Sequence, residues 1–209
     1  MKEQETPQGK SYHDHVIKDG RFIGDFDGMY AAFEDPWMQS EQPNQFSRTA
    51  GIVHLRTRGM RSVLECGCGL GYYAQRIHRE TGIVPISVDI SSVAIAKAKK
   101  LFPHLRFEVA DIAHDLRRYK EVDCLLFAEL IWYILPQLDA INAVLSDVFK
   151  GKWLLVNQVF YKGSQQYGTE YFTSLQEFIN YMPFEAVAQC EATSVEQTTI
   201  ETSTLFRIA

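Results

Sequence analysis

The sequence predicts an α/β protein: a mostly parallel sheet of seven strands with helices on both faces, preceded by a helical N-terminal cap. Three observations lead to this prediction. From about residue 60 onward, short apolar runs alternate with amphipathic helical stretches, which is typical of parallel strands joined by crossover helices. Two strand-like runs then follow each other directly near the C-terminal end, which indicates an antiparallel edge. Before residue 60, apolar residues recur at helical spacing instead.

The composition is that of one ordinary globular protein. The chain has 209 residues, 46% of them hydrophobic and 22% charged, so it can bury a sizeable core. Its formal net charge of −5 gives no overall positive field, so neither nucleic acid nor an anionic membrane is expected as a partner. The first ten residues are polar, and the longest nearly apolar run, 124–135, is too short to span a bilayer. We therefore expect a cytoplasmic protein.

Disulfide and metal chemistry are not expected. Cys66, Cys68, Cys124 and Cys190 are too few and too scattered for a disulfide framework, so we expect reduced, buried thiols. The six histidines show no metal-ligand spacing with a third donor nearby. The absence of a Gly-x-Ser-x-Gly elbow and of a Walker-type lysine argues against hydrolase and phosphoryl-transfer chemistry.

The N-terminal part is predicted to consist of a flexible tail, residues 1–10, and a helical cap, residues 11–59. Apolar residues three and four apart predict an amphipathic helix within 20–37, which ends where Pro36 restricts the residue before it. A second helix is expected over residues 44–58 and is closed by a glycine. Its buried side is predicted to consist of Phe46, Ala50, Val53 and Leu55.

Residues 60–209 are predicted to form the α/β domain itself. Its strands are expected at residues 62–65, 85–89, 105–110, 123–127, 153–159, 184–192 and 196–207. Its helices are expected at residues 72–80, 92–100, 136–150 and 175–181. Ser91 should cap the second of these helices, and Gly151 should end the third.

A glycine-rich turn follows the first strand of this domain. In the run ECGCGLG, the alternating Gly67, Gly69 and Gly71 let the backbone pass close under a ligand, where a Cβ would collide with it. The helix that follows points free N–H groups into the crevice at the carboxyl end of the strand. A dinucleotide-binding turn would need glycine or alanine where Tyr72 stands. The carboxylate of Glu65 would repel a pyrophosphate. It therefore favours a ligand with a cationic end, which carries a sulfonium and an ammonium.

Two further carboxylates follow the next two strands. Asp89 could accept hydrogen bonds from both hydroxyls of a ribose, or it could cap the helix that begins near Ser91. Asp111 could accept a hydrogen bond from the exocyclic amine of adenine, while Ile90 and Ile112 sandwich the ring. The ligand interpretation is favoured because these residues follow the glycine-rich turn at suitable distances.

The motif series ECGCGLG, VDIS and VADI resembles that of class I S-adenosylmethionine-dependent methyltransferases, over about residues 60–160. The resemblance implies a Rossmann-like fold, S-adenosyl-L-methionine as the cofactor and S-adenosyl-L-homocysteine as the product. It also implies that residues 60–209 form the methyltransferase domain, and that the backbone from Gly67 through Cys68 to Gly71 lines the methionine moiety. By the same resemblance, Asp89 binds ribose and Asp111 contacts adenine.

A narrower resemblance concerns the run FAELIWYIL at residues 127–135. It is similar to the segment after the fourth strand in the nodulation-type N-methyltransferases, which methylate an amino sugar. The run DPW at residues 35–37 and the helix carrying Arg48 resemble the N-terminal cap of that group. This resemblance implies that Arg48 pairs with the carboxylate of the cofactor. Residues 39–45 depart from the pattern, which leaves the cofactor lid and the acceptor pocket open.

Five side chains are candidates for the acceptor site. Glu129, at the tip of the fourth strand, could orient or deprotonate the acceptor, or could instead contact the amino group of the cofactor. Tyr30 and Trp37 are expected to wall the acceptor pocket opposite Trp132 and Tyr133. Aromatic residues after a strand are often core residues, so this second pair could also lie in the core.

The sequence therefore predicts a small-molecule methyltransferase, and it favours the nitrogen of a sugar-like or metabolite amine as the acceptor. The alternatives are an O-methyltransferase of a saccharide or secondary metabolite, and a catalytically silent scaffold protein that binds the cofactor. The expected partner is a small-molecule methyl acceptor, with the protein acting as a monomer or a homodimer. The identity of the acceptor is not fixed by the sequence.

Overall fold

A computed structural model describes residues 11–41, 45–163, 165 and 167–209. Seven strands form its main sheet: β3 (Val63–Cys66), β4 (Ile86–Asp89), β5 (Arg106–Val109), β6 (Cys124–Ala128), β7 (Trp153–Tyr161), β8 (Glu185–Thr193) and β9 (Thr199–Arg207). The longer helices are α2 (Phe26–Ala32), α3 (Gln45–Thr57), α4 (Tyr72–Thr81), α5 (Ser92–Leu101), α8 (Leu138–Val148) and α9 (Leu175–Tyr181). Short helical segments are α1 (His13–Val16), α6 (Ile112–Asp115), α7 (Ile131–Ile134), and the 3-10 turns η1 (Gln39–Glu41), η2 (Leu116–Tyr119) and η3 (Leu135–Gln137).

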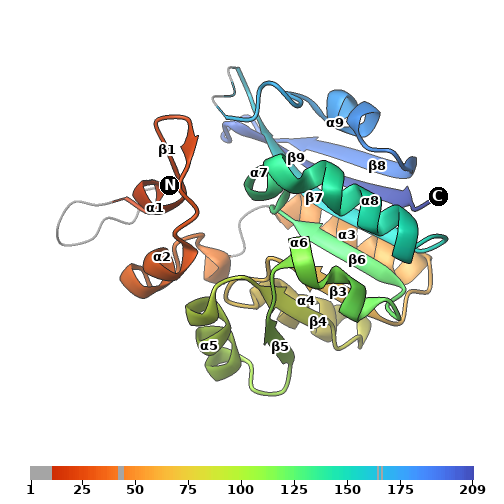
Figure 1. Ribbon diagram of the computed structural model, residues 1–209, viewed down its shortest axis with the longest axis horizontal. Helices are drawn as coiled ribbons and strands as arrows, with labels where there is room; N and C mark the ends of the chain where they lie inside the picture. Colours follow the sequence, from red (N-terminus) through yellow and green to blue (C-terminus); the bar gives the residue numbers. More distant parts are fainter. Residues whose placement is uncertain (1–10, 42–44, 164, 166) are drawn as a thin grey trace.

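The strand order is β5-β4-β3-β6-β7-β9-β8, with helices on both faces of the sheet (Figure 1). The strands from β5 to β7 are parallel to one another, and β9 runs antiparallel to both β7 and β8. The predicted mostly parallel sheet with an antiparallel edge is confirmed. None of the described helices has both the length and the apolar composition needed to cross a membrane.

The centre of the sheet holds the point where the strand order reverses. β3 pairs with β4 on one side and with β6 on the other, all three being parallel. The chain leaves β3 through α4 toward β4, but reaches β6 only after crossing back over β3. The loops that follow β3 and β6 therefore diverge, and open α/β sheets bind their ligands at this position. The glycine-rich turn follows β3, so it opens at this switch point.

Alternate residues of β3 face two different cores. Leu64 and Cys66 lie in the larger core, together with residues of α8 and α9. Val63 lies in a second core, together with residues of α3 and α4. Because side chains alternate along a strand, Glu65 faces the same side as Val63, and it is only 1% exposed. The sheet thus places a buried carboxylate on its α3 face.

The helix expected within residues 20–37 is shorter than predicted. β1 (Ile17–Lys18) and β2 (Arg21–Phe22) form a small antiparallel hairpin, and only Phe26–Ala32 are helical. Asp19 and Gly20 connect the hairpin with φ of 51° and 71°, as an Asp-Gly two-residue turn requires. Gly24 has φ of 74°, and this left-handed conformation excludes a continuous helix.

The second N-terminal helix has nearly the predicted bounds, but its buried face was predicted wrongly. Phe46 and Val53 are 57% and 51% exposed, although both were expected in the core. The residues buried on α3 are Ser47, Arg48, Gly51, Ile52 and Leu55, so of the four predicted residues only Leu55 is buried. The physical reason is that the start of α3 is held by polar side chains of β7, β9 and α4, while only Ile52 and Leu55 pack in the apolar core. The expected tail, residues 1–10, and the expected first residue of this helix lie outside the described residues.

The two glycines that bound α4 provide a matched pair for a stability test. Gly71 and Gly82 both have left-handed φ, of 82° and 77°. A Cβ on Gly71 would lie 2.5 Å from Cζ of Phe107, whereas a Cβ on Gly82 would meet nothing within 4 Å. We expect Gly82→Ala to lower the free energy of unfolding by about 1 kcal/mol through backbone strain alone. Gly71→Ala should lower it by about 3 kcal/mol, because overpacking adds to the strain.

Chemical denaturation of both variants, without any ligand, measures this difference. Equal losses of stability at the two positions would contradict the packing role of Gly71.

Candidate functional site

The glycine-rich turn is held in shape mainly by the chain itself. Gly67, Gly69 and Gly71 have φ of 74°, 55° and 82°, which residues with a Cβ rarely adopt. A Cβ on Gly67 would lie 3.0 Å from Cδ1 of Leu130, and a Cβ on Gly71 would collide with Phe107. From the sequence, all three glycines are expected to allow the close approach of a ligand. At these two positions the structure shows a different cause, because the backbone conformation and packing within the chain already require glycine.

At Gly69 the neighbouring atoms come from the N-terminal segment. A Cβ there would lie 2.6 Å from Oη of Tyr30 and 2.8 Å from Oε1 of Gln39. The amide of Gln39 accepts a hydrogen bond from the backbone N–H of Leu70 at 2.7 Å, and donates one to the carbonyl of Cys68 at 3.4 Å. The N-terminal segment therefore lies directly on the glycine-rich turn.

Gln39 was not predicted as a site residue. It lies in the stretch that departs from the motif pattern, so no motif pointed to it. The local signal is the preceding Asp35-Pro36 pair: the carboxylate of Asp35 accepts hydrogen bonds from the backbone N–H groups of Gln39 and Ser40, at 2.8 and 2.7 Å. This capped turn presents the side chain of Gln39 to the glycine-rich turn.

Asp89 lies at the end of β4 and is 8% exposed. Its two carboxylate oxygens accept hydrogen bonds from the backbone N–H groups of Gly69, at 2.8 Å, and of Ser91, at 2.9 Å. Burial raises the pKa of this carboxyl group, and the hydrogen bonds oppose that effect. The helix cap of α5 is Ser91, whose Oγ accepts from the backbone N–H of Ala94 at 3.0 Å. Asp89 thus links the glycine-rich turn to β4 and is not the cap residue of α5.

A second contact holds the N-terminal segment across the crevice. Asp27 on α2 accepts hydrogen bonds from the hydroxyls of Ser91 and Ser92, at 2.7 and 3.2 Å, and from the backbone N–H of Val93 at 3.2 Å. These hydrogen bonds, that from Ser91 foremost, lower the pKa of Asp27. Together with Gln39, this contact fastens the segment to both the glycine-rich turn and the first turn of α5.

The three residues expected around adenine differ in their exposure and in their contacts within the chain. Asp111 follows β5 and caps α6, since its carboxylate accepts from the backbone N–H of Ala113 at 2.9 Å and contacts Nδ1 of His114 at 2.8 Å. Ile90 is 53% exposed, whereas Ile112 is 8% exposed and belongs to the larger core. Of the two isoleucines expected to sandwich a ring, only Ile90 presents an open side chain.

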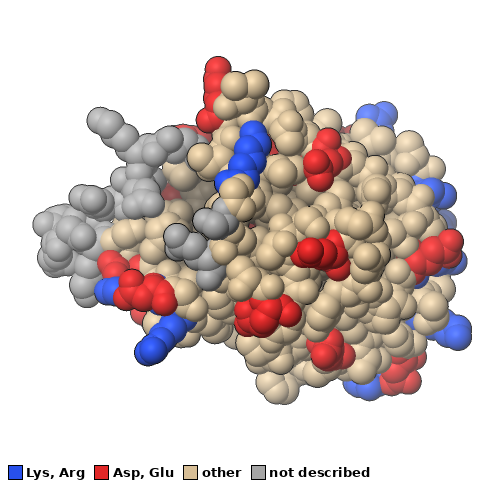
Figure 2. All heavy atoms as spheres, turned by 90° about the horizontal axis from the view of Figure 1, so that it is seen from above, with Lys and Arg blue, Asp and Glu red and all other residues tan. Residues whose placement is uncertain are grey.

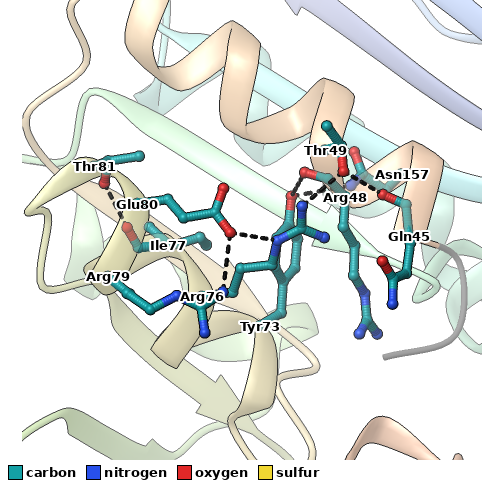
Figure 3. A network of polar contacts seen from close by, with 10 residues as sticks. All are labelled: Gln45, Arg48, Thr49, Tyr73, Arg76, Ile77, Arg79, Glu80, Thr81 and Asn157. Carbon is teal, nitrogen blue, oxygen red and sulfur yellow. Dashed lines mark hydrogen bonds and ion pairs between the residues drawn. The ribbon is translucent and has the colours of Figure 1, made fainter. Parts of the chain in front are cut away.

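Arg48 is the most unusual side chain of the site. It is 5% exposed, and its guanidinium group forms no hydrogen bond or ion pair with any residue that the structure describes. Its Cζ lies 5.3 Å from the centroid of the Tyr73 ring. In Figure 3 the guanidinium points away from the hydrogen-bonded group formed by Thr49, Arg76 and Glu80. A buried cation without a partner is costly, so this position favours an anionic ligand.

A polar network beneath α3 fixes where Arg48 lies. Asn157 on β7 donates hydrogen bonds to the carbonyl of Ser47 at 3.0 Å and to Oη of Tyr73 at 3.1 Å. Tyr73 in turn donates to the carbonyl of Arg48 at 3.1 Å. Glu201 on β9 accepts from the backbone N–H of Ser47 at 2.9 Å, which satisfies a free donor of the first helical turn. Three elements therefore anchor the start of α3.

Two carboxyl groups with raised pKa values lie near Arg48. Burial raises the pKa of Glu65 to about 7, although the Ser87 hydroxyl, which donates to it at 2.7 Å, and the charge of Arg48 oppose the shift. Burial also raises the pKa of Glu129 to about 8, with Arg48 opposing the shift and Glu201 adding to it. These side chains therefore gather one cation and two carboxyl groups at the carboxyl ends of β3 and β6.

The backbone of Glu129 is held in a strained conformation. Its φ is 58°, in the left-handed region that a residue with a long side chain seldom adopts. Its backbone N–H donates to the carbonyl of Asn157 at 2.8 Å, which fixes the strained residue to β7. Its Oε1 is buried and has no hydrogen-bond partner among the described residues. The chain thus keeps an unsatisfied carboxyl oxygen at the tip of β6.

The aromatic residues expected around an acceptor divide into two groups. Tyr133 lies 5.7 Å from Trp37 and 5.6 Å from Phe26 between ring centroids, and Tyr30 belongs to the same cluster. Trp132 instead lies in the larger core, where its Nε1 donates to the carbonyl of Val159 at 3.1 Å. Consecutive residues of a helix point in different directions, so α7 sends one ring toward the N-terminal segment and the other into the core. Of the two interpretations open for Trp132, its position in the structure favours a core residue.

Residues 63–150 match the protein family described as a methyltransferase domain. This range contains the glycine-rich turn, Asp89, Asp111 and Glu129. Over these residues, which make up less than half of the chain, the protein is similar to a methyltransferase domain. The match supports S-adenosyl-L-methionine as the cofactor, as the sequence predicted. No curated protein sequence matches the chain significantly.

Solved structures of similar fold extend the likeness beyond this range. The N-methyltransferase NodS from Bradyrhizobium japonicum WM9, solved with S-adenosyl-L-homocysteine, has a TM-score of 0.67 and 16% identity over 87% of this chain and 95% of its own. PH0226 from Pyrococcus horikoshii OT3 has a TM-score of 0.66 and 16% identity over 88% of this chain and 100% of its own. The [4+2]-cyclase SpnF has a TM-score of 0.60 and 14% identity over 76% of this chain and 80% of its own. At such identities the likeness establishes the fold, and the fold alone does not name the reaction.

The raised pKa of Glu65 gives a test of the buried charge cluster. Because the folded-state pKa of about 7 lies above the ordinary 4.5, folding favours the neutral carboxyl group. This contribution is complete below the ordinary pKa and is lost as the pH rises through the folded-state value. In the wild type, the free energy of unfolding should therefore fall by about 3 kcal/mol between about pH 5 and pH 8 as Glu65 ionises. We expect Glu65→Gln, which keeps an acceptor for Ser87, to lack this fall.

Chemical denaturation across that pH range measures the effect, and Glu121→Gln, at an exposed position, is the control. A wild-type stability that stays flat from about pH 5 to pH 8 would contradict a buried, neutral Glu65.

Proposed function

We propose that the protein is a methyltransferase that uses S-adenosyl-L-methionine to methylate the nitrogen of a small molecule, an amine of a sugar-like or other metabolite. The observation that carries the proposal is the buried guanidinium of Arg48, unpaired among the described residues, beside the glycine-rich turn and the carboxyl groups of Glu65 and Glu129. One cation and two carboxyl groups complement a ligand that carries a carboxylate, an ammonium and a sulfonium.

The residues fit the parts of that cofactor one by one. Arg48 would pair with its carboxylate, since a guanidinium can bind a carboxylate through two parallel hydrogen bonds. Glu65 would face its cationic end, with the backbone from Gly67 through Cys68 to Gly71 lining the methionine moiety. Asp89 would accept from the ribose hydroxyls through lone pairs not used by Gly69 and Ser91. On the adenine, Asp111 would meet the exocyclic amine, and the open side chain of Ile90 would contact the ring.

When bound, S-adenosyl-L-methionine supplies a methyl group that the sulfonium charge already activates. The protein therefore has to orient the acceptor and exclude water, and oriented proximity alone can lower a barrier by about 7–11 kcal/mol. An amine acceptor must also lose its ammonium proton. Glu129, with a pKa raised to about 8, is a stronger base than an ordinary carboxylate, and its strained backbone fixes its position. We assign it the role of orienting and deprotonating the amine.

The aromatic cluster next to Glu129 supports a small acceptor. Burial raises the pKa of the Tyr133 hydroxyl well above its ordinary value, and nearby Tyr161 and Glu129 add to the shift. Aromatic faces such as those of Trp37, Tyr30 and Tyr133 attract ammonium groups and cover the apolar faces of sugars. On the face shown in Figure 2, acidic and basic residues are interspersed, and its described residues form no continuous basic area that would follow a nucleic-acid backbone.

Residues 11–59 act in this proposal as a lid. Gln39 and Asp27 fasten the segment across the crevice, and the atoms of Tyr30 and Gln39 lie against Gly69. A ligand that is to lie on the glycine-rich turn must displace these contacts, and the segment can then close over it. Such a lid would exclude water around a sulfonium. Arg48, at the end of the lid, would hold it through the carboxylate of the cofactor.

Two measurements test the proposed function. Calorimetry with S-adenosyl-L-methionine tests binding, and a mass-spectrometric screen of amines and saccharides tests transfer of one methyl group. Methylated amines support the proposal. Methylation confined to saccharide hydroxyls would make the protein an O-methyltransferase, and binding without any methylated product would make it a scaffold protein.

Removing the guanidinium of Arg48 should weaken cofactor binding and unlatch the lid. We expect Arg48→Ala to lower the affinity for S-adenosyl-L-homocysteine by about ten- to a hundredfold, the value of a charge-assisted pair. In limited proteolysis, the ligand should protect bonds between His15 and Arg58 in the wild type and much less in Arg48→Ala. Arg56→Ala, at an exposed position of the same helix, is the control. Cleavage that is equal with and without ligand in the wild type would rule out the lid.

Removing the carboxyl group of Glu129 should change the pH profile of the reaction. As a base it acts only when ionised, so kcat/KM should rise with pH through its pKa of about 8. We expect Glu129→Gln to lower kcat about a hundredfold and to remove this rising limb. Glu121→Gln is the exposed control. If kcat/KM of Glu129→Gln still rises with pH in this range, the rise reports the ionisation of the amine. That result would contradict the role of Glu129 as the base.

A further inference from the structure

A cavity of about 390 Å³ opens at the amino ends of the central strands, at the opposite edge of the sheet from the glycine-rich turn. It is lined by Arg58, Gly59, Met60, Arg61, Asp123, Lys150, Gly151, Lys152 and Trp153. These residues come from the end of α3, from the segments that enter β3 and β6, and from the loop between α8 and β7. The cavity shares no residue with the candidate methyltransferase site.

Positively charged side chains outnumber carboxylates in the lining of the cavity. Arg58, Arg61, Lys150 and Lys152 line it, and none of them forms an ion pair with any residue that the structure describes. Lys152 donates a hydrogen bond to the carbonyl of Lys120 at 2.6 Å, which fixes its position without neutralising it. Other surface cations of this protein do pair, as in the 2.7 Å contact between Arg117 and Asp147. This cationic cluster stands in a protein whose formal net charge is −5.

Asp123 is the carboxylate that lines the cavity, and its position limits its effect on these cations. Its Oδ2 accepts hydrogen bonds from the backbone N–H groups of Arg61 and Ser62, at 2.9 and 3.1 Å. These hydrogen bonds, that from Arg61 foremost, lower its pKa, so it is ionised at neutral pH. Its charge is directed to two backbone amides at the entry to β3, and a surplus of positive charge faces the cavity.

Trp153 orders two guanidinium groups at the rim. Cζ of Arg207 lies 4.4 Å from the centroid of the Trp153 ring, and Cζ of Arg58 lies 5.3 Å from it. Cation–π contacts of this kind hold the guanidinium planes in place and reduce the entropy lost when they bind a ligand. Because guanidinium groups cover the ring, a nucleotide base has little room to stack on it. The arrangement suits a compact anion.

We propose that this cavity is a second ligand site, which binds a phosphate group carried by a small metabolite or free in solution. Guanidinium groups match phosphate oxygens through paired hydrogen bonds, and lysines add point charges. The site is independent of the proposed methyl transfer, because it lies at the other edge of the sheet and is built from other residues.

Calorimetry at low ionic strength, with inorganic phosphate and with ribose 5-phosphate as probes, tests the proposal. The double variant R61A/K150A should bind both probes at least about tenfold more weakly than the wild type. The matched control K99A/K100A removes the same charge from exposed positions on α5 and should bind as the wild type does. Tighter binding of ribose 5-phosphate identifies a phosphorylated metabolite as the ligand, and equal binding identifies free phosphate.

Two results would overturn the proposal. One is the absence of measurable binding of either probe to the wild type at low ionic strength. The other is equal weakening in R61A/K150A and K99A/K100A, since that would show attraction by overall charge alone. Circular dichroism and thermal denaturation of both double variants establish that they are folded. The test stands whether or not the protein proves to be a methyltransferase, because neither probe nor variant involves the other site.

Discussion

The site depends above all on the burial of the Arg48 guanidinium beside two carboxyl groups. A charge taken out of water is stable only where the surrounding structure compensates it, and here the compensation is incomplete. Glu65 and Glu129 have pKa values near neutrality, so they do not neutralise the guanidinium as fully as ordinary ionised carboxylates would. The folded protein thus holds an uncompensated positive charge at the carboxyl ends of its central strands, and this charge is the basis of the proposed ligand site.

The N-terminal segment belongs to the same electrostatic arrangement. Charges at the end of a sheet interact strongly only if water is kept away from them. Gln39 and Tyr30 do this over the glycine-rich turn, and Asp27 holds the segment to α5. The cap is therefore more than a cover for apolar surface, because its polar side chains make hydrogen bonds to the backbone that a ligand would use.

The sequence predicted well what local patterns determine. The apolar runs predicted where the seven strands lie along the chain, because a strand's pattern depends on residues close together in sequence. The buried face of α3 was predicted wrongly, since Ser47 and Arg48 are buried by hydrogen bonds to Asn157, Glu201 and Tyr73, which are distant in sequence. The contact of Gln39 with the glycine-rich turn and the direction of the Trp132 ring were not predicted for the same reason. Each depends on a partner that no local pattern identifies.

The bond between Ser47 and Glu201 joins residues 154 positions apart. A ribosome makes α3 long before it makes the carboxylate of Glu201 on β9, which anchors this helix. While the chain is being synthesised, α3 can form its own hydrogen bonds, yet its anchor on Glu201 is missing until β9 inserts between β7 and β8. The position from which Arg48 is proposed to bind the cofactor is therefore fixed only after β9 has been synthesised and has joined the sheet.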